Sequence, residues 1–97
     1  MRKVRDDRYD VLRNALGENI KTLSMTKKWN EKPVSTLADL CGVTQSNVSN
    51  WIAGRSLPNV LQLSIIAEYF GVTMEWLIKK HTKEELMETI IDRKDSD

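Results

Sequence analysis

The segment VSTLADLCGVTQSNVSNWIA, residues 34–53, has the pattern of two short helices joined by a tight turn. In each half, apolar residues recur three or four positions apart, which places them on one face of a helix. Gly42 lies between the halves and suits a helix C-terminus, because glycine tolerates positive φ. Thr44 is a good N-cap for the second helix. The apolar residues of the segment are Leu37, Ala38, Cys41, Val43, Val48 and Trp51.

The outward face of the second helix is polar but uncharged. It carries Gln45, Ser46, Asn47, Ser49 and Asn50, whereas a solvated helix face usually carries Glu and Lys. Amides and hydroxyls both donate and accept hydrogen bonds, so this face suits the base edges in the major groove of DNA. The alternative interpretation is an ordinary polar helix face.

This segment and the elements after it resemble the lambda-repressor-like family of helix-turn-helix regulators, also described as Cro/C1-type or XRE. The resemblance runs from about residue 20 to residue 78. It implies a five-helix DNA-binding domain in which the second motif helix is the recognition helix. The matching residues are Leu37, Ala38, Cys41, Gly42, Val43, Thr44, Gln45, Ser46, Val48, Trp51, Gly54, Arg55, Pro58, Leu63, Ile66, Ala67, Phe70, Gly71, Val72 and Leu77.

The resemblance, together with the positions of polar residues around the second motif helix, predicts two sets of DNA contacts. The base-reading candidates are Gln45, Ser46, Asn47, Ser49 and Asn50. The phosphate-binding candidates are Ser35, Thr36, Thr44, Arg55 and Asn59. Val34 departs from the family pattern, since several relatives have a polar phosphate-binding residue there. For each single phosphate candidate, a solvated surface group is the alternative.

Helical patterns also occupy the rest of the chain. Helices are expected near residues 7–28, 34–41, 45–53, 60–70 and 74–80, with an amphipathic helix near 82–94. Gly17, inside the first helix, costs roughly 1 kcal/mol relative to Ala. Thr82 and Glu85 form a capping box for the last helix. We therefore predict an all-α fold, with a DNA-binding domain in residues 1–80 and a C-terminal helical tail in residues 81–97. The expected apolar stripe of the first helix is Tyr9, Leu12, Leu16, Ile20 and Leu23.

Composition predicts one small soluble domain in the cytoplasm. The chain has 97 residues, 40% of them hydrophobic and 30% charged. No apolar run approaches the roughly 18 residues of a membrane span, and a single cysteine excludes an internal disulfide. The net charge is only +1, but residues 1–32, 33–80 and 81–97 carry net charges of +4, 0 and −3. A basic front and an acidic tail fit DNA contact at one end.

The resemblance also predicts a homodimer on a palindromic operator. Several surface positions are more apolar than a monomer needs. The alternative is that the tail packs on its own domain. The expected dimer residues are Val60, Leu61, Ile65, Trp76, Leu86, Met87, Ile90 and Ile91.

The sequence contains no recognisable motif for catalysis, metal binding or cofactor binding. His81 is the only histidine, and Cys41 has no plausible catalytic partner. No glycine-rich phosphate loop is present. We expect no enzyme activity, no cofactor and no small-molecule ligand.

The sequence therefore predicts a transcriptional regulator that binds double-stranded DNA, most simply a phage-type or prophage-type repressor. One alternative is an antitoxin that uses its acidic tail to hold a toxin. Others are a protein-interaction module with the same fold, and the front of a longer repressor.

Overall fold

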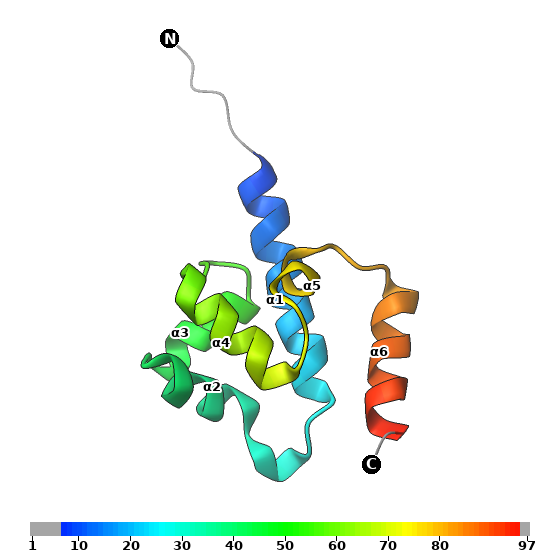
Figure 1. The fold of residues 1–97 in the computed structure, drawn as a ribbon. Coiled ribbons are helices and arrows are strands. Elements are labelled where there is room, and N and C mark those ends of the chain that lie inside the picture. The colour runs from blue at the N-terminus through cyan, green and yellow to red at the C-terminus, as the bar shows by residue number, and fades with distance from the viewer. Residues whose placement is uncertain (1–6, 96–97) are drawn as a thin grey trace.

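The computed structural model describes residues 7–95, apart from the side chains of Trp29 and Asp95. Every regular element in this part of the chain is a helix (Figure 1). The all-α prediction, with five helices and an additional C-terminal helix, is confirmed. Residues 1–6 and 96–97, the ends of the two predicted regions, lie outside the described residues. The elements are α1 (Asp7–Met25), the 3₁₀ helix η1 (Trp29–Glu31), α2 (Pro33–Cys41), α3 (Gln45–Ile52), α4 (Val60–Phe70), α5 (Met74–Ile78) and α6 (Lys83–Asp95).

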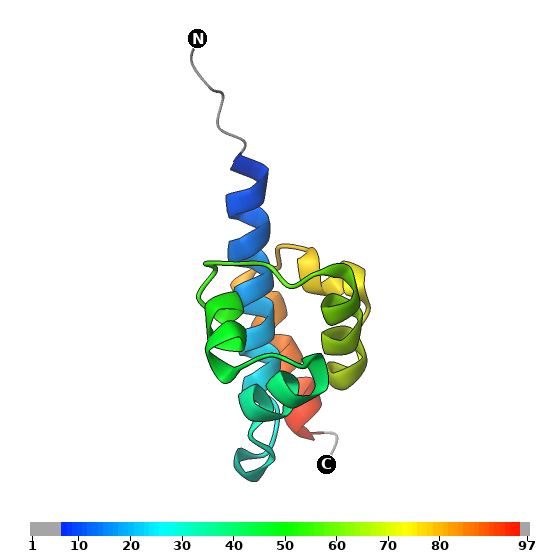
Figure 2. The ribbon, with the colours of Figure 1, turned by 90° about the vertical axis from the view of Figure 1, so that its left-hand side faces the viewer.

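Helix α1 is the common support of the fold, since it contacts α3, α5 and α6. Its first turns project beyond the other helices (Figures 1 and 2). The predicted apolar stripe is buried at Leu16, Ile20 and Leu23. Tyr9, in the first turn of α1, is 59% exposed. The N-terminal end of the apolar stripe is therefore not part of the core.

The first helix ends three residues earlier than predicted, at Met25. Both the N–H and the hydroxyl of Thr26 donate to the Leu23 carbonyl, at 3.0 and 2.6 Å. The predicted connection then contains η1 and the left-handed residue Lys32, with φ of +48°. Pro33 takes the first position of α2, where its missing N–H would have had no partner in the helix.

The hydrophobic core is built from buried side chains of α1, α2, α3, α4 and α5. Its aliphatic and aromatic side chains are almost fully removed from water, which is the main favourable contribution to folding. Asn59 caps α4 as predicted, because its Oδ1 accepts the N–H of Gln62 at 2.8 Å. The buried cluster is Leu16, Ile20, Leu23, Leu37, Ala38, Val48, Trp51, Ile66, Ala67, Phe70 and Leu77.

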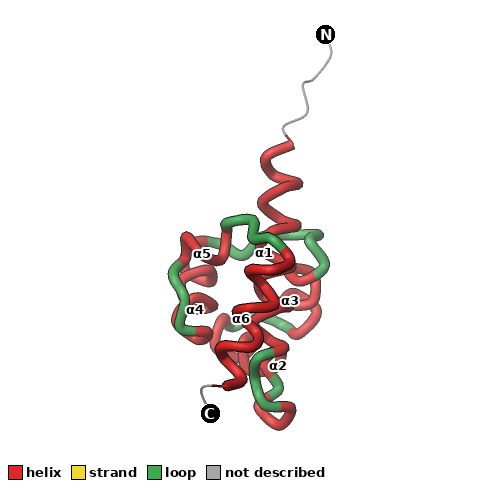
Figure 3. Tube along the Cα trace, turned by 90° about the vertical axis from the view of Figure 1, so that its right-hand side faces the viewer, coloured by secondary structure: helices red, strands yellow, loops and turns green. Residues whose placement is uncertain are grey.

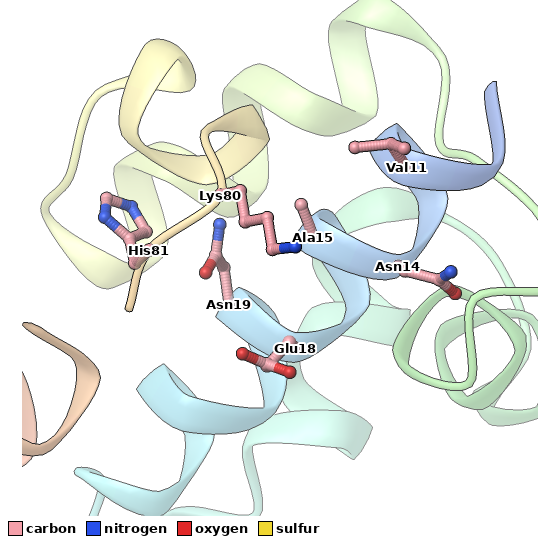
Figure 4. A pocket seen from close by; sticks show the side chains of 7 residues that line it. All are labelled: Val11, Asn14, Ala15, Glu18, Asn19, Lys80 and His81. Atoms are coloured by element: carbon pink, nitrogen blue, oxygen red, sulfur yellow. The ribbon is translucent and has the colours of Figure 1, made fainter. Parts of the chain in front are cut away.

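A buried polar side chain joins α1 to α5. Asn19 is 1% exposed, and its Nδ2 donates to the carbonyls of Leu77 and Lys79 at 2.7 and 2.8 Å. The last carbonyls of a helix have no partner within the helix, so Asn19 satisfies the end of α5. Figure 4 shows Asn19 pointing from α1 towards the segment after α5, beside a cavity of about 140 Å³.

Helix α6 packs against α1 on the side away from α2 and α3 (Figures 1 and 3). Leu86 of α6 is buried, at 7% exposure. Arg93 donates to the Phe70 carbonyl at the end of α4, at 2.8 Å. The predicted capping box of Thr82 and Glu85 is confirmed by reciprocal bonds of 3.1 and 2.8 Å. The C-terminal helix therefore lies on its own chain and leaves the motif helices uncovered.

Candidate nucleic-acid interface

The turn between α2 and α3 has the geometry that the sequence predicted. Gly42 takes a φ of +69°, a value that disfavours any residue with a Cβ. The N–H of Val43 returns to the Ala38 carbonyl at 3.0 Å. Thr44 caps α3, since its hydroxyl oxygen accepts the N–H of Asn47 at 3.2 Å. The buried residues of the motif are Leu37, Ala38, Val48 and Trp51.

The end of α3 rests directly on the backbone of α1 at Gly17. A Cβ at Gly17 would lie 2.7 Å from the carbonyl oxygen of Trp51, and closer still to that of Ile52. Real Cβ atoms do not approach oxygen this closely. Glycine thus allows the close contact that sets the position of α3, and α1 continues through it without a break.

The polar face of α3 is open to solvent. Gln45, Ser46, Asn47 and Ser49 are exposed, and Asn50 is half-buried. No residue of α3 carries a charge. Because α6 lies on the far side of α1 (Figures 1 and 2), it does not cover this face. The five predicted base-reading residues therefore share one short helix that is available to a ligand.

A groove of about 410 Å³ lies between the start of α2 and the start of α3. It brings Ser35, a predicted phosphate ligand, beside Gln45, a predicted base reader. Lys32 adds a cation to the same groove. Thr36 is half-buried and its hydroxyl donates to the Glu31 carbonyl at 3.0 Å, so this hydroxyl is engaged within the chain. The groove is lined by Lys32, Pro33, Val34, Ser35 and Gln45.

The other predicted phosphate ligands make contacts within the chain. Arg55 is exposed, and its Nη1 donates to Oδ1 of Asn50 at 3.0 Å. The backbone N–H of Asn59 donates to Oε1 of Gln62 at 2.9 Å, which completes a capping box with the bond described above. The hydroxyl oxygen of Thr44 is an acceptor in the α3 cap. These contacts hold the three side chains in place around the two ends of α3 and the start of α4.

The thiol of Cys41, at the end of α2, is part of the packing between α2 and α4. Burial raises the pKa of the Cys41 thiol, so the thiol stays neutral near pH 7. Its Sγ lies 3.9 Å from the Gln62 carbonyl and joins α2 to α4.

Among residues 7–95, His, Cys, Asp and Glu side chains form no group of three that could hold a metal ion. No helix in this range is long and apolar enough to cross a membrane.

The predicted dimer residues fall into two separate groups. Val60 and Leu61 are 75% and 68% exposed in the first turn of α4. On α6, Met87 and Ile91 face solvent at 62% and 54% exposure. Since α6 contacts the opposite end of α4, about 15 Å along that helix, the two groups do not form one patch. Ile65, Trp76 and Ile90 are half-buried.

Leu86 requires a correction, because its own chain buries it. Adjacent residues of a helix point in different directions, so Leu86 turns towards α1 while Met87 turns away. The alternative in which the tail packs on its own domain describes this side of α6.

The sequence does not identify two residues of α1 that hold other helices in place. Gly17 reduces the helix propensity of α1, and an isolated glycine in a helical pattern can also mark a close packing contact. Asn19 lies on the apolar face of α1, where a polar residue needs a partner. The polar interruption of the stripe was the available signal.

Comparison with known families finds the same segment. Residues 32–77 match the family model described as Helix-turn-helix. The match spans α2 to α5 and excludes α1 and α6. No curated protein and no solved structure matches the chain significantly.

Proposed function

We propose that this chain, whose residues 32–77 match the helix-turn-helix family model, is a DNA-binding transcriptional regulator, and more narrowly a repressor that binds a palindromic operator as a homodimer. The observation that carries the proposal is the exposed face of α3, which is made of amides and hydroxyls on a helix seated against Gly17. Such a face offers hydrogen bonds to base edges without the non-specific attraction of Lys or Arg.

Base reading is assigned to the first turns of α3. Gln45 and Ser46 are exposed at its N-terminus, and Asn50 follows one turn later. A bidentate contact from one amide contributes about 1–3 kcal/mol of discrimination against the wrong base. Asn47 and Ser49 complete the face, and either one contacts a base or a neighbouring phosphate.

Phosphate binding is assigned to the borders of this face. Lys32 and Ser35 share the groove beside Gln45. At the other border, the capped N-terminus of α4 at Asn59 directs backbone N–H groups outward, and such termini favour anions. These contacts supply most of the affinity, which should fall steeply with salt.

The dimer is assigned to the start of α4. Val60 and Leu61 are the two most exposed large apolar residues of the described chain. They follow α3 by a short loop, so copies that meet there carry their recognition helices close to the two-fold axis. The half-sites would then lie about one helical turn of DNA apart. A dimer bound over a promoter would exclude polymerase, which is the proposed means of repression.

The proposal is tested by selecting bound duplexes from a random DNA library at about physiological salt. We expect enrichment of a palindrome, and we expect Gln45→Ala to lose the preference at one base pair of each half-site. Glu88→Gln, at an exposed position of α6 away from α3 and from the start of α4, is the control and should select the same palindrome. Folded protein that enriches no sequence would contradict the proposal.

The dimer surface is tested separately by sedimentation at micromolar concentration. Leu61→Asp should convert the dimer to a monomer, while Ile91→Asp should leave the mass unchanged. The reverse result would move the interface to α6.

A second candidate function rests on the outer face of α6. Met87 and Ile91 remain exposed on a helix that already packs on α1 through Leu86, and residues 81–97 carry a net charge of −3. These features favour an antitoxin that binds a small basic toxin through α6. Co-purification of such a toxin with the full chain, and its loss in a Met87→Asp variant, would support this function.

A further inference from the structure

A hydrogen bond links the end of the recognition helix to the loop that follows it. Nη1 of Arg55 donates to Oδ1 of Asn50 at 3.0 Å. The backbone supports this contact, because the N–H of Arg55 donates to the Asn50 carbonyl at 2.9 Å. Two bonds between the same residues hold the guanidinium and the amide side by side at the rim of the exposed α3 face.

The chemistry of the guanidinium decides which way the amide points. Arginine carries only donors, so the atom of Asn50 that faces it must be the carbonyl oxygen. The NH₂ group of Asn50 is then on the opposite side of the amide. The orientation of this amide is thus determined by its partner.

This orientation changes what Asn50 offers to a base. An unrestrained Asn can pair with adenine by accepting from N6 and donating to N7. With its oxygen directed at Arg55, Asn50 presents mainly its two N–H donors. Guanine is the base whose major-groove edge shows two neighbouring acceptors, O6 and N7.

We propose that Arg55 is a positioning residue that sets the specificity of Asn50, turning it from an adenine reader into a reader of guanine acceptors. The inference rests on the proposed function, since it assumes that α3 reads bases. In this proposal Arg55 has a second role besides the phosphate contact predicted from the sequence. The guanidinium has five N–H donors, so one of them can hold Asn50 while others meet the backbone of DNA.

The test measures binding of the full chain to duplexes that differ at one base pair. That base pair is identified as the one where Asn50→Ala loses its preference in a duplex selection. We expect the unchanged protein to prefer guanine over adenine there by about tenfold. Arg55→Ala should lose most of this preference, while keeping its preferences at the other positions. Arg55→Lys, which still donates to Oδ1, should restore part of it.

A double variant separates positioning from phosphate binding. The four duplexes carry each of the four possible base pairs at this position. When Asn50 is already Ala, adding Arg55→Ala should lower the affinity for all four duplexes by one common factor and change no base preference. Equal weakening of all four duplexes by Arg55→Ala in the unchanged protein would overturn the inference. So would a preference for adenine at this position. The proposed function would survive either result, and it would fail only if the unchanged protein selected no sequence.

Discussion

Helix α1 supports a different kind of contact on each of its two sides. On one side, the end of α3 approaches the α1 backbone at Gly17, and its side chains Val48 and Trp51 are buried. On the other side, α6 is held by the buried Leu86 and by the Arg93 bond to a carbonyl. The first contact is made by backbone and core and leaves little freedom. The second is made by side chains that can separate without opening the core.

This difference matches the roles proposed for the two helices. A helix that reads base edges must be held in one place, because a small displacement breaks several hydrogen bonds at once. A helix that serves a partner can tolerate local opening, since regions with few buried contacts open at low free-energy cost. Variants on each side of α1 test whether the two contacts differ in this way.

The largest effect is expected from Gly17→Val. The new side chain meets the carbonyls of Trp51 and Ile52, so α3 must move or α1 must bend, at a cost of about 3 kcal/mol in the free energy of unfolding. DNA affinity should fall as well. Chemical denaturation measures the first effect and a binding titration measures the second. Glu18→Ala, exposed on the same helix, is the control and should change neither. Wild-type DNA affinity in Gly17→Val would mean that the contact between α3 and the α1 backbone is not needed for DNA binding.

A smaller effect is expected from Leu86→Ala. Removing a buried leucine side chain costs about 2 kcal/mol or more, but here the loss should appear as local release of α6. Amide exchange in α6 should accelerate while exchange in α3 and the affinity for DNA stay the same. Met87→Ala is the matched control, because this neighbour is 62% exposed. If exchange in α3 also accelerated, the two sides of α1 would be one cooperative unit.

The cap of α3 should contribute about 1 kcal/mol. Thr44→Ala removes the acceptor of the Asn47 N–H, and the first turn of α3 should fray. Thermal unfolding reports the loss of stability, and Thr44→Ser should retain it because the hydroxyl remains. Equal stability of the Ala and Ser variants would show that the hydrogen bond is dispensable.

The smallest expected effect is a pH dependence of the N-terminal cap of α6 that the cap of α3 does not share. The backbone hydrogen bond from Thr82 lowers the pKa of the exposed Glu85 carboxyl, and the Thr82 hydroxyl and the charges of His81 and Lys79 act in the same direction. Because the folded-state pKa is the lower one, the stabilisation is present above the unfolded pKa and is lost as pH falls through the folded value. The cap of α3 contains Thr44, which does not titrate.

Amide exchange of the first turn of α6 should therefore accelerate as pH falls below about 4.5, after correction for the intrinsic exchange rate. The first turn of α3 should not respond. Glu85→Gln keeps an acceptor without the titration and should flatten the response of α6. A parallel response of both helices would assign the change to global acid unfolding.

Much of the domain could be predicted from local patterns. The predicted helix caps are present in the structure, because a cap depends on residues only a few positions apart. The capping residues are Gly42, Thr44, Asn59 and Thr82. The same holds for the exposed polar face of α3, whose periodicity separates it from Val48 and Trp51. The ends of α1 were less predictable, since Tyr9 belongs to the apolar stripe but is 59% exposed.

Local sequence is enough to specify the helices, their caps and the uncharged face of α3, because helical periodicity and capping are properties of neighbouring residues. Tertiary structure alone decided that Gly17 is a contact surface and that Asn19 closes α5. It also decided that Leu86 is internal. The physical reason is distance along the chain: Asn19 and Leu77 are 58 residues apart, and no local pattern encodes which distant backbone or carbonyl a side chain will meet.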